Sequence, residues 1–391
     1  MNTTQQGVIT LLKSAVLQKA LPLPAGFDLE QAYPNLKQHH MSATLFEGAV
    51  LCGVPQDLPI MKRLLQSNCK ALLVSERQIR LTNQICDVFE ANSIDYMLLK
   101  GCKMKPLYPK PELRMMGDVD ILVRMEQYDR IRPLMENLGL TEGSVTDHEL
   151  HWYKQKLLVE LHSKLIPSYN KDFYSYFGDG WFLAKNEQGS RYYMAAEDEM
   201  VYLFTHFAKH YRDGGIGCRH VLDLWVFLWA NPRIDEEKVK QELEKLHLRE
   251  FYENIRRVIE VWFADAPGDE KTDFITDFIF SSGSWGTGES QTASIAVRDQ
   301  AHKKGSFRAK AVYFMRHAFP DVKMLREKYR ILKKAPWMLP LVWIYRPFYK
   351  LLHKEERASV GRHRENLRNI NPKNLQNRHQ ALQYVGLDYN F

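Results

Sequence analysis

The sequence predicts an α+β protein in which a small mixed sheet is flanked by helical regions toward both ends of the chain. Two features predict the sheet: an apolar run at residues 97–99 that stops at a Lys-Gly pair, and a run at residues 118–123 that alternates acidic and apolar side chains. Residues 1–90 predict helices because apolar residues recur there at a spacing near 3.6. A further helix is predicted from Ala196, where acidic residues occupy the first turn.

Two carboxylates stand at the start of the second predicted strand. Successive side chains of a strand point to opposite faces, so Asp118 and Asp120 share one face, while Val119 and Ile121 face the core. Adjacent carboxylates repel each other, and a divalent cation bound by hard oxygen ligands relieves that repulsion. The pair therefore predicts a Mg²⁺ site, against the alternative of an Asp-x-Asp in a surface turn.

A Lys100-Gly101 pair directly follows the first predicted strand. Glycine lets the backbone approach a phosphate closely, and the N–H groups at the start of a following helix favour anions. One short stretch thus combines a predicted phosphate-binding turn with a predicted metal-binding pair.

Residues 96–123 resemble the nucleotidyltransferase superfamily that has the DNA polymerase β-like fold, and more narrowly the bacterial uncharacterised nucleotidyltransferase family. The resemblance rests on the order of strand, glycine turn and Asp-x-Asp strand, and on Lys100-Gly101, Leu107-Tyr108-Pro109 and Arg114. The sequence has Gly101-Cys102 where the wider superfamily usually has Gly-Gly or Gly-Ser.

The resemblance implies a polymerase β-like core, a small mixed sheet with helices, whose carboxylates hold two Mg²⁺ ions, with Mn²⁺ as a substitute. Asp118 and Asp120 are two of the implied catalytic and metal-binding residues, and Glu160 is the third, because a Leu-His follows it as in the family. Two β-like runs at 150–156 and 157–165 form a hairpin or successive strands. Glu160 and His162 share one face of the strand. His162 is expected to take one of three roles: to orient Glu160, to contact a phosphate, or to pack in the protein interior.

The implied activity is that of an enzyme, a nucleotidyltransferase, which moves a nucleoside monophosphate from an NTP to an acceptor hydroxyl or phosphate and releases pyrophosphate. The acceptor is a small molecule, a peptide or RNA. The residues expected to bind the nucleotide are Lys100, Gly101, Cys102, Arg114, His162, His206, His210 and Arg219.

Three of these expectations have alternatives. His206 and His210 lie four residues apart and share a helix face, which also fits a zinc site. Arg219 has a planar guanidinium that matches phosphate oxygens, but a salt bridge with Asp223 is equally expected. A separate pair, His39-His40, suggests metal ligation, but we expect it to pack or face solvent because adjacent helical residues do not share a face.

We expect four regions along the chain. They are an N-terminal helical region (residues 1–92), the catalytic core (93–195), a helical domain that completes the cleft (196–335), and a basic, aromatic-rich segment that packs on the core (336–391). Residues 167–189 and the Gly-rich stretch 281–290 are expected to be loops, and the residues after 371 a loosely held tail.

The composition, with 26% charged and 45% apolar residues, is ordinary for a soluble globular protein. The five cysteines are dispersed without a Cys-x-x-Cys pair, which favours reduced thiols in a cytoplasm over a disulfide framework. No apolar run approaches a membrane-spanning length, and the first residues predict a helix and not a signal peptide. Nothing in the sequence predicts the oligomeric state.

Positive charge is concentrated at the C-terminus. Residues 323–391 contain fifteen Lys or Arg and five Asp or Glu, whereas the whole chain carries +7. This predicts contact with an anionic partner: RNA, a polyanionic glycan or a lipid surface. The apolar run at 337–351 is typical of a peripheral membrane helix, but Pro336, Pro340 and Pro347 argue against a long regular helix and favour packing on the core.

Two rival functions stay open. Toxin-type nucleotidyltransferases share the Lys-Gly and Arg-x-x-x-Asp-x-Asp pattern, some modify tRNA, and a basic C-terminus suits RNA. The other rival is a catalytically silent nucleotide-binding scaffold, against which the presence of all three carboxylates counts.

Overall fold

The computed structural model describes residues 1–283, 294, 314–315, 318–320, 322–325, 329, 331–352 and 372–390. The chain divides into two compact units. The first consists of Met1–Tyr211, Gly215–Trp285 and Val385–Phe391, and the second of Arg212–Gly214 and Gly286–Tyr384. The polar stretch expected as a loop at 281–290 falls outside the described residues from 284 onward.

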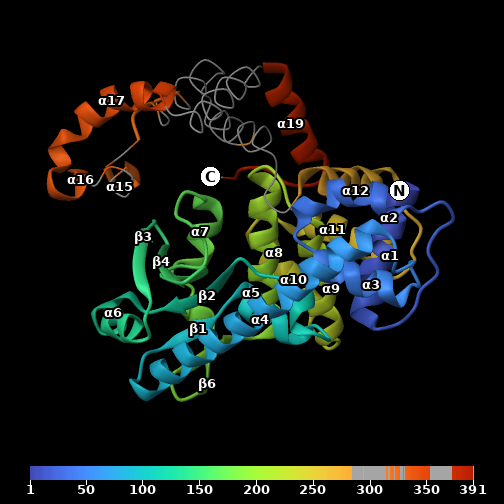
Figure 1. Cartoon of the computed structure of the whole chain (residues 1–391), viewed down its shortest axis with the longest axis horizontal. Coiled ribbons are helices and arrows are strands. Elements are labelled where there is room, and N and C mark those ends of the chain that lie inside the picture. Colours follow the sequence, from blue (N-terminus) through green and yellow to red (C-terminus); the bar gives the residue numbers. More distant parts are fainter. Residues whose placement is uncertain are drawn as a thin grey trace. The chain divides into compact units, whose positions relative to one another are not determined.

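Within the described residues, the first unit is built on a seven-stranded mixed sheet (Figure 1). Its strands in chain order are β1 (Tyr96–Leu98), β2 (Asp118–Val123), β3 (Thr141–Val145), β4 (Glu149–Lys154), β5 (Leu157–His162), β6 (Ala184–Gln188) and β7 (Arg191–Met194). Their order in space is β3-β4-β5-β2-β1-β7-β6. The pairs β2–β5 and β1–β7 are parallel, and the other neighbours are antiparallel. An α+β architecture with helical regions beside a mixed sheet is therefore confirmed.

Helices fill the N-terminal part of the chain, as the apolar spacing predicts. They are α1 (Thr3–Leu17), α2 (Leu29–Leu36), α3 (Ser42–Leu51) and α4 (Pro59–Ala91). The last of them, α4, is a single helix of 33 residues.

One face of the sheet is the hydrophobic core. Val119 and Ile121 of β2 and Val159 and Leu161 of β5 lie in one buried cluster with side chains of α4 and of α6 (Tyr128–Asn137). Because successive side chains of a strand point to opposite faces, the residues between these apolar ones in β2 and β5 lie on the other face of the sheet. That opposite face carries every acidic residue of these two strands.

The remaining helices of the first unit follow β1 or the later strands. They are α5 (Lys100–Met104), α7 (Lys171–Phe177), α8 (Ala196–Arg212), α9 (Cys218–Ala230), α10 (Glu236–Lys245), α11 (Arg249–Phe263) and α12 (Glu270–Ser282). The prediction that residues 167–189 form a loop is wrong, because α7 and β6 lie within this stretch. Strand β6 is mostly exposed and polar, so its sequence lacks an apolar alternation, and the strand forms through its pairing with β7.

The second unit contains α15 (Val322–Leu325), α16 (Ile331–Lys334), α17 (Leu339–Leu352) and α19 (Pro372–Tyr384). Prolines do not break α17 into pieces as expected: Pro340 occupies its second position, where an N–H is not needed, and the helix continues through Pro347. Val342 packs in a cluster with Leu325 and Leu332. Whether residues 336–391 pack on the core stays a prediction.

The expectation of a loose tail after residue 371 is also wrong. Leu375 and Leu382 of α19 are buried, as are Val385 and Leu387 just beyond it. Across the described parts of the chain, no helix has both the length and the hydropathy required to cross a bilayer.

Candidate active site

The three predicted carboxylates lie on one face of two neighbouring strands. In the parallel pair of β2 and β5, Asp120 is the register partner of Glu160, and Asp118 stands two residues before it on the same face. Asp120 is 2% exposed and Glu160 9% exposed. The residues between them point to the core, so burial of Val119, Ile121 and Val159 fixes the direction of all three acids.

Asp120 is held by two cationic or polar partners. Lys100 Nζ and His162 Nε2 each lie 2.8 Å from Asp120 Oδ1. Burial alone would raise the pKa of Asp120, but the Lys100 ammonium and the His162 hydrogen bond outweigh it and hold the pKa below its usual range. Asp120 is therefore ionised, and His162 must donate its Nε2 proton to it.

The pKa of Asp118 shifts in the opposite direction. Burial, followed by repulsion from the Asp120 carboxylate, raises the pKa of Asp118 to about 7, and Glu160 contributes to the same effect. Lys100 lowers the pKa of Asp118 but does not cancel the repulsion. The site thus holds more negative charge than its own lysine neutralises.

The Lys-Gly turn differs in detail from the prediction. Lys100, and not Gly101, has a left-handed backbone, with φ of 42°. Gly101 matters for space: a Cβ there would lie 3.0 Å from Met116 Sδ and 3.3 Å from Arg114 Nη1. The strained Lys100 backbone places its ammonium over the strand that carries Asp120.

A cavity of about 270 Å³ opens above the carboxylates. Strands β2, β4 and β5 supply four of its acids, and α8 and α9 supply its opposite wall, including Asp223 of α9. Among the predicted site residues, those that line it are Lys100, Gly101, Arg114, Asp118, Asp120, Glu160, His206, His210 and Arg219. The structure therefore brings together residues more than one hundred positions apart.

Cys102 and His162 do not line this cavity. Cys102 belongs to the hydrophobic core cluster, and its backbone N–H donates to the Leu99 carbonyl, so neither its thiol nor its amide is directed at a ligand there. His162 is fully buried beneath Asp120, with Nε2 also 3.6 Å from Glu160 Oε2. Among the open alternatives for His162, contact with the two carboxylates is the observed one.

The guanidinium of Arg114 donates its hydrogen bonds to other protein groups. Its Nε and Nη2 donate to the two oxygens of Asp223 at 3.1 and 2.8 Å, and its Nη1 donates to the Met115 carbonyl. Tyr108 Oη also donates to Asp223 at 2.7 Å. Two residues of the sequence motif, Tyr108 and Arg114, are thus joined by an aspartate of α9.

The alternative of an Arg219–Asp223 salt bridge is wrong, because Asp223 pairs with Arg114. Arg219 Nη1 donates to the Met115 carbonyl at 3.1 Å, and its buried Nε has no hydrogen-bond partner. Burial, followed by repulsion from Arg114, lowers the pKa of Arg219 to about 10. A half-buried guanidinium with an unused donor at the cavity wall is suited to an anionic ligand.

His206 and His210 face each other on α8, with their Nε2 atoms 3.1 Å apart. Burial and mutual repulsion hold the pKa of His206 well below 6.5, and burial does the same for His210. Among the described residues, no cluster of three or more potential metal ligands includes either histidine. His39, by contrast, packs as predicted: its Nε2 lies 3.2 Å from the Phe280 carbonyl, and its Nδ1 accepts from the Cys218 N–H.

Sequence reasoning missed the site residues on β4. Glu149 lines the cavity and His151 lies beside it: His151 Nε2 is 3.4 Å from Glu149 Oε2 and 3.5 Å from Glu160 Oε1. In the antiparallel pair of β4 and β5, His151 is the partner of Glu160 and Glu149 the partner of His162. The alternation of polar and apolar residues in Glu149-Leu150-His151-Trp152 was the available signal.

A cavity lined by carboxylates on the central strands of a mixed sheet, with lysine and arginine beside them, has the donor set that could hold a metal cation together with an anionic ligand. A family model described as "Uncharacterised nucleotidyltransferase" matches residues 25–264, which include every residue of the cavity. The chain belongs to this nucleotidyltransferase family. No curated protein and no solved structure matches it.

Proposed function

We propose that this chain is a Mg²⁺-dependent nucleotidyltransferase that transfers a nucleoside monophosphate from an NTP to a hydroxyl or phosphate of an acceptor. The observation that carries the proposal is the placement of Asp120 beside Glu160 on parallel strands, with Lys100 at 2.8 Å from Asp120, in one cavity with Asp118. Family membership supports the reaction class, and a polymerase β-like core is the fold that we propose for the sheet and its helices.

The residues present fit a divalent metal. Asp118, Asp120 and Glu160 offer only hard carboxylate oxygens, which Mg²⁺ prefers and which Mn²⁺ also accepts. Burial, followed by repulsion from Asp120, raises the pKa of Asp118, and a bound cation would oppose both effects. When bound, two such ions would supply positive charge to the triphosphate and to the attacking oxygen.

The protein's own cations would orient the triphosphate. Lys100 and Arg219 line the cavity from the sheet side and the helix side, and Arg219 has an unused Nε. Arg114, whose nitrogens are engaged by Asp223 and Met115, positions the turn before β2 instead of contacting phosphate. A cavity of about 270 Å³ is slightly smaller than ordinary ligand pockets, which start at about 300 Å³, and suits the phosphate portion of an NTP.

The proposed step forms one bond and breaks another. The acceptor oxygen attacks the α-phosphorus, the bond from that phosphorus to the bridging oxygen of pyrophosphate breaks, and the acceptor proton goes to Glu160. His151, which is 3.5 Å from Glu160 Oε1, lies where it can receive or share that proton. Neutral His206 and His210 offer hydrogen bonds to the substrate without adding charge.

The test is incubation of the full chain with α-labelled NTPs, Mg²⁺ and cell extract, followed by measurement of labelled product and pyrophosphate. Asp118→Asn should lower turnover by at least about 100-fold while the fold is kept, because it removes a carboxylate that would hold the metal ion whose positive charge stabilises the reacting phosphate. Asp129→Asn, an exposed carboxylate of α6, is the matched control and should retain full activity. Unchanged turnover in Asp118→Asn would refute the assignment.

The same assay separates the acceptor classes. Label on RNA, with a rate that falls steeply with salt, supports the tRNA-modifying alternative that the basic residues 323–391 suggest. Label on a peptide or small molecule supports the others. Thermal stabilisation by an NTP that disappears with a chelator supports the enzyme, whereas stabilisation by lipid vesicles alone supports the scaffold.

A further inference from the structure

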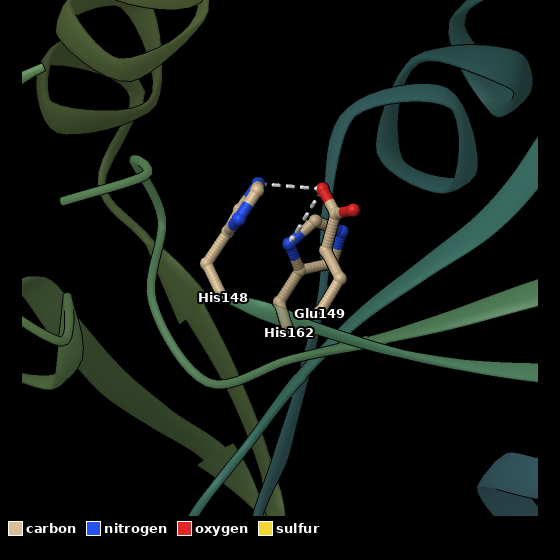
Figure 2. A group of neighbouring side chains, drawn as sticks. All are labelled: His148, Glu149 and His162. Carbon is tan, nitrogen blue, oxygen red and sulfur yellow. Dashed lines mark ion pairs between the residues drawn. The ribbon is translucent and has the colours of Figure 1, made fainter. Parts of the chain in front are cut away.

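Three potential metal ligands gather at the edge of the cavity where β4 begins and β5 ends. Glu149 is the first residue of β4, His162 is the last residue of β5 and its direct partner, and His148 immediately precedes β4. Figure 2 shows one oxygen of the Glu149 carboxylate joined by dashed lines to a nitrogen of each imidazole ring. The set offers two nitrogens and one oxygen, unlike the carboxylates assigned above to Mg²⁺.

The distances between these atoms are close to those between the ligand atoms of a metal site. Glu149 Oε1 lies 2.7 Å from His148 Nε2 and 3.9 Å from His162 Nδ1. One ligand atom from each residue lies within 4.8 Å of the others. Ligand atoms of a tetrahedral zinc site are about 3.3 Å apart, since each lies about 2 Å from the metal. Small side-chain rotations would bring all three atoms to that spacing.

His162 gives an independent indication of a ligand. Its side chain is fully buried, and Nδ1 has no hydrogen-bond partner although it faces the Glu149 carboxylate. The other ring nitrogen is used, because Nε2 donates to ionised Asp120 at 2.8 Å. Buried polar atoms are rarely unpaired, so Nδ1 is the atom that a bound cation would complete.

We propose that His148, Glu149 and His162 form a binding site for a transition-metal dication of the Zn²⁺ type, separate from the Mg²⁺ carboxylates. Imidazole nitrogens favour Zn²⁺, Co²⁺ and similar ions over Mg²⁺, which explains why a second ion class would sit here. Asp120 accepts from the remote nitrogen of His162, which is the carboxylate–histidine–metal arrangement that orients such ligands. The site does not depend on the proposed nucleotidyl transfer.

The test is titration of the chelator-treated full chain with Zn²⁺ by calorimetry, and with Co²⁺ by visible absorption, in the presence of excess Mg²⁺. We expect one ion per chain at this site, undisplaced by Mg²⁺, and Co²⁺ bands of nitrogen and oxygen ligands without thiolate charge transfer. Loss of a residue that only supports a metal ligand typically weakens metal binding about 10–100-fold. His148→Asn and Glu149→Gln each remove a ligand, so each should weaken Zn²⁺ binding by more than that.

Two matched pairs of variants make the result decisive. Asp120→Asn should weaken Zn²⁺ binding about 10–100-fold through His162, whereas Asp118→Asn, which does not contact His162, should not. His247→Asn replaces an exposed histidine with a left-handed backbone that Asn accepts, and should bind as the parent does. Equal Zn²⁺ affinity in the parent and in His148→Asn, displacement by Mg²⁺, or a thiolate band would overturn the proposal.

Discussion

Lys100 Nζ lies 2.8 Å from Asp120 Oδ1, and the two charges compensate each other at the floor of the cavity. Their side chains are 17% and 3% exposed, so each charge depends on the other. Lys100→Met should destabilise the fold by about 3–5 kcal/mol, the cost of leaving one partner of a buried pair. Chemical denaturation measures this loss.

The double variant Lys100→Met/Asp120→Asn is the control for that prediction. With both charges gone, the loss should be smaller than the sum of the two single losses by at least about 0.5 kcal/mol. Strictly additive losses would mean that the contact does not couple the two residues.

Asp118 makes stability depend on pH in a defined direction. Its pKa rises from 3.8 to about 7 in the folded protein, so the folded state holds the proton more tightly than the unfolded state does. The associated stability is present below about pH 4 and is lost as pH rises toward 7. Without metal, Asp118→Asn should therefore melt higher than the parent at pH 8 and equally at pH 4, and added Mg²⁺ should narrow the gap. A gap that does not vary with pH would contradict the shift.

Two arginines at the cavity should respond differently to substitution. Arg114→Met leaves Asp223 buried with only Tyr108 as a partner and should cost about 3–5 kcal/mol in unfolding free energy. Arg219→Met removes one hydrogen bond to a carbonyl and should cost only about 1 kcal/mol, yet weaken NTP binding. Denaturant melts and NTP titration, run on both variants, check this. Equal losses of stability would show that Arg219 is structural.

His39 should be a second source of pH dependence, remote from the carboxylates in sequence. Burial lowers the pKa of His39 from 6.5 to about 4, despite its contact with the Phe280 carbonyl. The unfolded chain therefore binds the proton first, and about 3 kcal/mol of stability is lost as pH falls from 6.5 toward 4. His39→Gln should be less stable than the parent at pH 7.5, with a gap that shrinks toward pH 5. A constant gap over that range would refute the prediction.

The part of the site that follows a local rule was accessible from sequence. The alternation of residues 118–123 placed Asp118 and Asp120 on one face and Val119 and Ile121 on the other, and the strand has those bounds. The same rule applied to β5 put Glu160 and His162 together, and the resemblance to the family was confirmed by the match over residues 25–264.

Contacts between distant segments required the tertiary structure. Arg114 and Arg219 were both possible partners for Asp223. The packing of α9 beside the turn before β2 decides that Asp223 pairs with Arg114, while Arg219 donates to the Met115 carbonyl. Cys102 follows the Lys-Gly pair directly and yet enters the core, because the left-handed Lys100 directs the first turn of α5.

The sequence by itself therefore determined which faces of β2 and β5 carry acids, because side-chain direction in a strand depends only on position along it. The tertiary structure alone decided that β4 lies beside β5 and brings Glu149 and His148 to the site, and which cation neutralises which carboxylate. Those choices depend on strand order and on burial, which are set by the packing of segments far apart in the chain.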